Sequence, residues 1–287
     1  MIAVRRPSSS IHVGALASRR SRTLLLVGLL SAGLVAVLVA GTVLTEAAET
    51  PDLVARRRPP SLDHPFGTDW LGRDQLARTL VGLRLSLLIG VVASTVSAIV
   101  ALLAGSAAGV LGRRVDAAVS WLVDLFLSVP HLVLLILVSF AAGGGVTGVI
   151  VAVGITHWPS LTRVLRGEAR RVASEPYVMI ARRLGRSGPT IARRHILPHL
   201  LPQFAVGLVL QFPHAILHEA SLSFLGLGLP PHSPAVGILL ADSMRYLSTG
   251  AWWLAALPGL ALLAVVKAVD TLGEQLRLLT DPGSAHL

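Results

Sequence analysis

The sequence predicts an all-α integral membrane protein with about six transmembrane helices, and two observations support this fold class. Of 287 residues, 53% are hydrophobic and 14% are charged, whereas a soluble domain carries nearer a quarter charged residues. The charges also fall into blocks separated by apolar runs long enough to cross a hydrocarbon core of about 30 Å. Basic loops beside such runs account for the formal net charge of +10, so we expect membrane lipid and no nucleic acid as a partner.

The first part of the chain predicts a cytoplasmic tail over residues 1–22 and a first transmembrane helix over 23–44. That uncharged run exceeds the apolar core of about 7–15 residues found in signal peptides, so a retained span is favoured. Residues 45–84 predict an extracytoplasmic, Pro-rich loop whose amphipathic end leads into the second span at 85–111. The second span is rich in Gly, Ala and Ser, which let helices approach closely in lipid. Residues 112–114 then predict a short hairpin.

The rest of the chain predicts four further spans. They complete a five-helix core over 85–272, followed by a short cytoplasmic tail over 273–287. In order, the sequence predicts a third span over 117–142, a glycine turn at 143–145, a fourth span from about 146 that runs on into a basic segment, a fifth span over 200–225, a Gly/Pro-rich loop over 226–250 with an apolar segment at 236–244, and a sixth span over 251–272.

A polar, strongly basic segment at 174–202 joins spans four and five and predicts two short helices. Ser174 is expected to cap the first helix, Pro176 suits its opening turn and Gly185 suits its end. Pro198 is expected to interrupt the second. We call this segment the elbow. A helical elbow between two spans is suited to dock on a partner in the water.

The distribution of basic residues predicts the orientation. Six spans place both termini on one side, and that side, with the elbow, holds eighteen Lys and Arg residues against seven on the other. The side with more Lys and Arg is normally cytoplasmic. The chain is therefore expected to be a multi-pass protein of a bacterial-type inner membrane, with cytoplasmic termini and elbow. Six of the seven opposing arginines lie in the loop over 45–84.

The elbow resembles the cytoplasmic coupling loop of ABC-type importer permeases. The pattern of that family is Glu-Ala-Ala, three residues, Gly, nine residues and Ile-x-Leu-Pro, and Gly185, Leu197 and Pro198 stand at the matching spacing. The Glu-Ala-Ala triplet falls on residues 179–181, which are Met-Ile-Ala, so Glu175 is the nearest acidic residue.

Two longer stretches, HPFGTDWLGRDQLARTLVGLRLSL at 64–87 and residues 219–263, resemble the dipeptide, oligopeptide and nickel branch of these permeases. The resemblance covers nearly everything from residue 62 onward. It implies a permease that moves di- or oligopeptides or nickel by alternating access, with two separate ATP-binding subunits, a second homologous permease subunit and an extracytoplasmic solute-binding protein as partners.

The resemblance also implies which residues couple this chain to the ATPase. The sequence has no Gly-x-x-x-x-Gly-Lys-Ser/Thr phosphate loop, so ATP and Mg²⁺ are expected on the partner subunits, with no cofactor on this chain and no enzyme activity of its own. The candidate coupling residues are Glu175, Tyr177, Met179, Ile180, Ala181, Arg182, Leu184, Gly185, Leu197 and Pro198.

Ionisable residues inside spans are functional candidates because they are costly in hydrocarbon. Asp124, two turns from His131, is expected to face the bundle interior, and Lys267 is expected to pair with Asp270 near the interface. The candidates for a translocation path are Asp124, His131, His157, His214, His218 and Glu219.

His214 and His218 are candidate metal ligands, since residues four apart share one face of a helix. Neutral imidazole suits nickel, copper or zinc, which would fit a permease of a nickel-specific system. Hydrogen bonding of the histidines across helices is the other reading. The sequence leaves both open.

Two functions of other classes compete with the importer permease. A membrane metalloenzyme would need a His-Glu-x-x-His motif, but the order here is His-x-x-x-His-Glu. An ATP-independent channel or carrier could use Asp124 and Asp270. Neither explains the basic elbow, and the cargo stays open among dipeptide, oligopeptide and nickel.

Overall fold

The computed structural model describes residues 13–280, and this part of the chain folds into helices without a β-strand. Five helices are long and apolar enough to cross a membrane, and a bent helix pair makes a sixth span if it is counted as one. The prediction of an all-α membrane protein with about six spans is confirmed.

The elements follow one another closely along the chain. In order they are α1 (Val13–Val43), α2 (Thr45–Glu49), η1 (Leu53–Ala55), α3 (Gln75–Val110), α4 (Arg113–Ser128), α5 (His131–Ala141), α6 (Gly145–Thr156), α7 (Trp158–Ala173), α8 (Pro176–Arg183), α9 (Gly188–Ile191), the π-helical turn η2 (Ala192–Ile196), α10 (Leu197–Phe224), α11 (Val236–Met244), η3 (Leu247–Thr249) and α12 (Trp253–Thr280).

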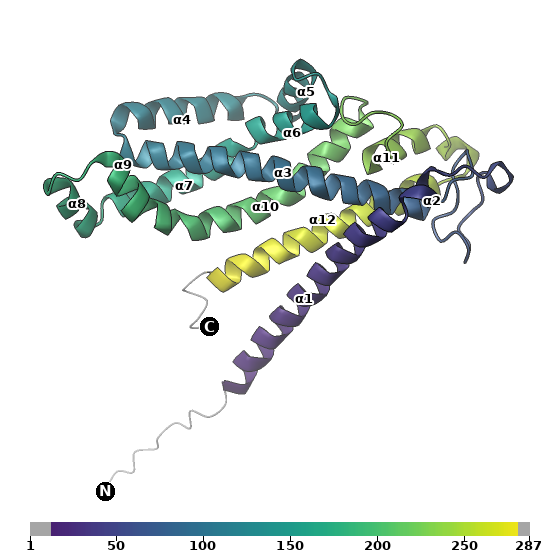
Figure 1. Ribbon diagram of the computed structural model, residues 1–287, viewed down its shortest axis with the longest axis horizontal. Helices are drawn as coiled ribbons and strands as arrows, with labels where there is room; N and C mark the ends of the chain where they lie inside the picture. Colours follow the sequence, from purple (N-terminus) through teal and green to yellow (C-terminus); the bar gives the residue numbers. More distant parts are fainter. Residues whose placement is uncertain (1–12, 281–287) are drawn as a thin grey trace, which may run out of the picture.

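Helix α3 is the centre of the bundle. It has 36 residues without an internal proline and packs along α7, α10, α6 and α1. Figure 1 shows it running through the middle of the molecule, with α4 along one side of it and α12 and α1 on the other. The contacts of α3 therefore connect most of the other helices.

Small residues let α7 approach α3 closely, as the composition of the second span predicts. A Cβ atom on Gly109 would lie 2.5 Å from Cβ of Ala169, and one on Gly105 would lie 2.9 Å from Cβ of Leu165. Both distances are below ordinary contact, so only glycine fits. The close packing of α3 on α7 depends on these two positions.

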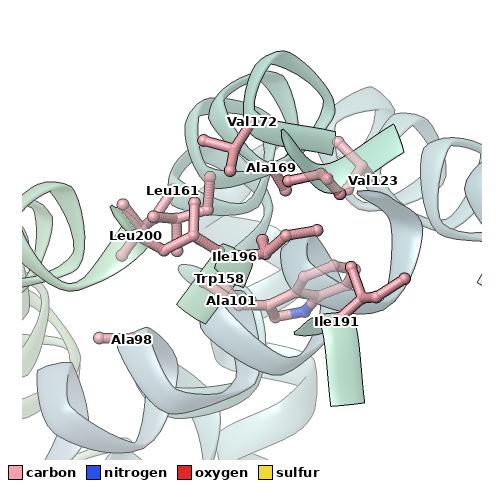
Figure 2. Close-up of a cluster of buried hydrophobic side chains, with 12 residues drawn as sticks. Ala98, Ala101, Val123, Trp158, Leu161, Ala169, Val172, Ile191, Ile196 and Leu200 are labelled. Carbon is pink, nitrogen blue, oxygen red and sulfur yellow. The ribbon is translucent and has the colours of Figure 1, made fainter. Parts of the chain in front are cut away.

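The cluster of buried side chains nearest the elbow joins α3, α4 and α7 to α8, α9, η2 and α10. It includes Ala101, Val123, Leu165, Ile191 and Leu200. Figure 2 shows Ala101, Val123 and Leu200 among the side chains that come together from separate helices, with the Trp158 ring between them. This apolar packing fixes the positions of the helices that carry the elbow.

The elbow and the long N-terminal loop lie at opposite ends of the molecule. Figure 1 places α8 at one end of the long axis and α2, the loop before α3 and α11 at the other. The beginning of α1 and the end of α12 lie toward the end that carries α8. This arrangement agrees with the expectation that the elbow and the termini share one side of the membrane.

The third predicted span is not one continuous helix. Helix α4 ends at Ser128, α5 begins at His131, and the two axes differ by 99°. Pro130 forces the bend because it lacks an N–H and holds Val129 in an extended conformation, with φ −88° and ψ 137°. The prediction of an unbroken span over 117–142 is corrected to a broken one.

Most of the predicted turns are present, but several predicted span boundaries move: α1 begins at Val13, α4 begins at Arg113 and α12 extends to Thr280. Gly143, Gly144 and Gly145 all have positive φ, as their turn requires, and α11 coincides with the predicted apolar segment at 236–244. The second span begins earlier than expected: α3 starts at Gln75, where the Asp74 carboxylate accepts a hydrogen bond from the Ala77 amide.

Two arginines of the loop at 45–84 are held by a buried carboxylate. Asp69 is 2.8 Å from Arg73 Nε and 2.6 Å from Arg78 Nη1, and the Arg78 side chain is buried. Charges that are fixed in an ion pair say less about membrane orientation than free loop charges do. The arginines in this loop are therefore a weaker argument against the predicted orientation than their number suggests.

Candidate functional site

The first candidate site is the elbow helix α8 and its borders. Helix α8 begins with Pro176 after an extended Glu175. Gly185 ends it with φ +79°, and the amide of Arg186 donates to the Ala181 carbonyl over 3.1 Å. This is a glycine-terminated helix end of the Schellman type. The predicted roles of Pro176 and Gly185 in the helix are confirmed.

The predicted cap at Ser174 is wrong. The Ser174 hydroxyl donates to the carbonyls of Arg170 and Arg171, over 3.1 and 2.7 Å, and so it closes the end of α7. Glu175 occupies the cap position of α8 without a side-chain capping bond, and its carboxylate lies 3.4 Å from Arg171. A serine one residue before the cap position bonds backward to the last turn of the preceding helix, whose Arg170 and Arg171 carbonyls also accept from the Ser174 amide.

The predicted interruption at Pro198 is also wrong. Helix α9, the π-helical turn η2 and α10 run on as one 37-residue helix from Gly188 to Phe224. The Leu197 amide bonds to the Ala192 carbonyl, five residues back. A π-turn of this kind widens the helix just before Pro198, where the proline ring would otherwise collide with a carbonyl.

Helix α8 presents apolar and basic side chains to its surroundings. Ile180 is 57% exposed and Leu184 is 79% exposed, and Tyr177 and Met179 are also exposed, while Ala181 is half-buried. Arg182 and Arg183 extend from its last turn. Exposed apolar residues flanked by cations are typical of a helix that docks in a groove.

One residue of α8 faces inward. Val178 is completely buried and packs in the cluster that contains Val172 of α7 and Leu200 of α10. The Tyr177 ring lies 5.9 Å from the His195 ring and 6.4 Å from the His199 ring. These contacts attach the elbow to both flanking spans. Nothing in the sequence distinguishes Val178 from its apolar neighbours Tyr177 and Met179, so only the packing of the folded chain reveals its role.

The second candidate site is a cavity of about 470 Å³ between the spans. It contains four of the six predicted path residues: His131, His157, His214 and His218. The lining residues are Leu127, His131, Thr156, His157, Ser160, Leu161, Val164, Gly207, Leu210, Gln211, His214 and His218.

Three of these histidines meet in space. The ring centroids of His131 and His157 are 4.5 Å apart, those of His131 and His218 are 4.8 Å apart, and those of His157 and His218 are 4.9 Å apart. They come from α5, the α6–α7 junction and α10. The predicted pair of His214 and His218 thus shares the cavity, but His218 faces the other two rings and His214 stands beside them.

Asp124 and Glu219 lie away from this cavity. The Asp124 side chain is 68% exposed and pairs with Arg163 over 2.7 Å, which contradicts the expectation that it faces the interior of the bundle. The carboxylates of α4 pair with arginines of the adjoining α7. Asp116 and Arg166 form a second such pair, 2.5 Å apart.

The Glu219 side chain is buried at the contact between α10 and α3. It accepts hydrogen bonds from the hydroxyls of Ser86 and Ser223. These hydrogen bonds hold its carboxylate between α3 and α10. Near the end of the last span, Lys267 and Asp270 are 2.7 Å apart, so their expected pairing is confirmed.

The arrangement is that of a membrane bundle with a cavity lined by four histidines and an exposed elbow, and comparisons with known proteins agree. Residues 101–276 match the model of a family described as binding-protein-dependent transport system inner membrane component. The dipeptide transport system permease protein DppC of Bacillus subtilis is 33% identical over 230 residues, covering 80% of this chain and 72% of that protein.

Two further relatives carry similar names. The probable D,D-dipeptide transport system permease protein DdpC of Escherichia coli is 37% identical, over 80% of this chain and 77% of that protein. The oligopeptide transport system permease protein OppC of Bacillus subtilis is 34% identical, over 81% of this chain and 76% of that protein. The chain therefore belongs to the binding-protein-dependent inner membrane components, the permeases of ABC-type importers.

Proposed function

We propose that this chain is the permease subunit of an ATP-driven importer of di- or oligopeptides, and that α8 receives the force from a separate ATPase subunit. One observation carries the proposal. Helix α8 exposes Ile180 and Leu184 to a partner while Val178 anchors it in the core. A basic loop that served only to set the membrane orientation would need neither an exposed apolar surface nor a buried anchor.

The elbow is placed to pass a displacement to the cavity. Val178 packs with residues of α7 and α10, and both of those helices line the cavity with Leu161 and His218. A push on α8 would therefore tilt two cavity walls together relative to α3. The exposed arginines Arg182 and Arg183 would orient the ATPase at the rim, where charges act more on association rate than on affinity.

The partners follow from the same reading. Two ATP-binding subunits would bind ATP and Mg²⁺ and dock on the elbow of this chain and of a second, homologous permease. A solute-binding protein would contact the opposite end of the molecule, including the loop at 226–250. The count of basic residues supports cytoplasmic termini in a bacterial-type inner membrane.

Peptides are the favoured cargo because the relatives compared above are named as peptide permeases. DppC and DdpC are named dipeptide permeases and OppC an oligopeptide permease. The solute-binding protein would choose among peptides, since it meets the cargo first.

The test compares two leucine substitutions at opposite ends of the molecule. Leu184 on α8 and Leu62 in the N-terminal loop are both exposed. We expect Leu184→Asp to abolish co-purification of the ATPase subunits and ATP-dependent uptake of a labelled dipeptide. Leu62→Asp, the matched control, should retain the ATPase, because it introduces the same charge far from the elbow.

Membrane insertion of both variants is checked by their yield in the membrane fraction. Normal ATPase retention and uptake in Leu184→Asp would refute the docking role of α8. Uptake by the wild-type chain without any ATPase would refute the importer itself in favour of a carrier.

A further inference from the structure

We propose that His131, His157 and His218 form a binding site for a divalent transition-metal ion such as Ni²⁺ or Zn²⁺. One ring nitrogen from each residue lies within 4.8 Å of the other two. No other group of three possible ligands meets this condition in residues 13–280. The proposal concerns this chain alone and holds whether or not α8 docks on an ATPase.

Each histidine of the cluster has one buried ring nitrogen without a partner. His131 Nε2, His157 Nε2 and His218 Nδ1 are buried and without a hydrogen bond in the described part of the chain. Buried polar atoms normally find partners. Three unsatisfied nitrogens at one place therefore indicate a ligand that accepts three lone pairs.

The second nitrogen of His157 fixes its tautomer. His157 Nδ1 lies 3.1 Å from the Val153 carbonyl oxygen. A carbonyl only accepts hydrogen bonds, so Nδ1 carries the proton and the unpartnered Nε2 keeps its lone pair. A bond from the outer nitrogen to a backbone carbonyl is the usual way in which proteins orient a metal-binding imidazole.

The spacing needs a small contraction to hold a metal. Nitrogen ligands about 2.0–2.1 Å from a tetrahedral ion lie about 3.3 Å from one another. The present limit of 4.8 Å thus requires the rings to close by about 1.5 Å at most, by the difference of these two values. His131 is the first residue of α5, directly after the Pro130 bend, and side-chain rotation there can supply the movement.

The remaining coordination position faces the cavity. Neutral imidazole is a good ligand for nickel, copper and zinc, but three of them leave the double positive charge of the ion uncompensated. None of the described residues that line the cavity is Asp or Glu, and Glu219 is engaged by Ser86 and Ser223. An anionic donor would therefore come from a molecule in the cavity, such as the carboxylate of a metal chelate.

The competing explanation is that water in the cavity satisfies the three nitrogens. Water would do so without selecting a transition metal. Binding of the metal itself separates the two explanations.

The experiment uses the full chain in lipid nanodiscs, purified with a tag that contains no histidine. Equilibrium dialysis with Ni²⁺ is expected to give about one ion per chain at saturation, lost in His157→Ala and His218→Ala. Replacement by Co²⁺ should give the intense visible absorption of a low-coordinate nitrogen site, and azide should shift that spectrum by entering the open position.

Two controls protect the result from misfolding and from surface binding. The double variant His195→Ala/His199→Ala removes two imidazoles at the elbow and should keep the bound ion. His157→Gln is a second, polar replacement at the site and should also lose it while eluting as a monodisperse protein. A wild-type chain that binds no Ni²⁺, or His157 and His218 variants that keep one bound ion, would overturn the proposal. An azide-insensitive Co²⁺ spectrum would overturn the open position.

Discussion

The attachment of the elbow to the bundle can be tested by truncating the one buried side chain of α8. Val178→Ala removes two carbon atoms from a completely buried position. At about 0.8 kcal/mol for each buried carbon, the loss is about 1.6 kcal/mol. Local detachment of α8 should then become about 15-fold more frequent, since 1.4 kcal/mol corresponds to a factor of ten.

The assay is hydrogen–deuterium exchange of the full chain in nanodiscs, read in a peptide that covers 176–186. Ile180→Ala is the matched control, because Ile180 is mostly exposed and lies on the same helix. Alanine raises helix propensity at both positions, so faster exchange in Val178→Ala reports lost packing and not a weaker helix.

We expect about 15-fold faster exchange of the slowest amides of α8 in Val178→Ala and little change in Ile180→Ala. Equal exchange in the two variants would show that Val178 does not hold the elbow. It would also remove the route by which a push on α8 reaches α7 and α10.

Three further predictions concern the rest of the fold. Gly185→Ala should destabilise the end of α8 by about 1–2 kcal/mol, because the residue has φ +79°, and faster exchange of amides 184–186 would show it; unchanged exchange would contradict the strain argument. Gly109→Ala should lower the thermal unfolding midpoint of the purified protein, since its Cβ would lie 2.5 Å from that of Ala169 at a cost of about 1–3 kcal/mol. Adding Ala169→Gly should restore part of the loss, and no rescue would place the cause elsewhere. Asp69→Asn should lower the same midpoint strongly, because removing one partner of a buried ion pair costs about 3–5 kcal/mol, while Asp270→Asn at an exposed pair should cost under about 1 kcal/mol; similar effects would contradict the role of burial.

The elbow was largely predictable because its signals are local. Pro176 and Gly185 act on their own backbone, and the structure has α8 between them. The same kind of rule failed at Pro198, since the π-turn before it admits the proline ring. At Pro130 the rule would have succeeded, yet the length of the mainly apolar stretch over 117–142 favoured a continuous span.

The histidine cluster could be predicted only in part. The spacing of His214 and His218 places both on one face of α10, but it cannot say which residues of other helices stand opposite. His131 and His157 reach His218 because of the bend after α4 and the packing of α6 against α5. Such contacts between distant segments depend on tertiary structure and cannot be predicted from the spacing of residues along the sequence.

The unbroken course of α3 has a mechanical consequence. At about 1.5 Å for each of its 36 residues it is about 54 Å long, so it extends well past a hydrocarbon core of about 30 Å. Its neighbours bend at Pro130, meet at a junction beside His157 or carry Pro213 in mid-helix. Any rearrangement should therefore leave α3 fixed. The segments before and after those prolines should move relative to one another, with the hinge at the level of the membrane where the three imidazoles meet.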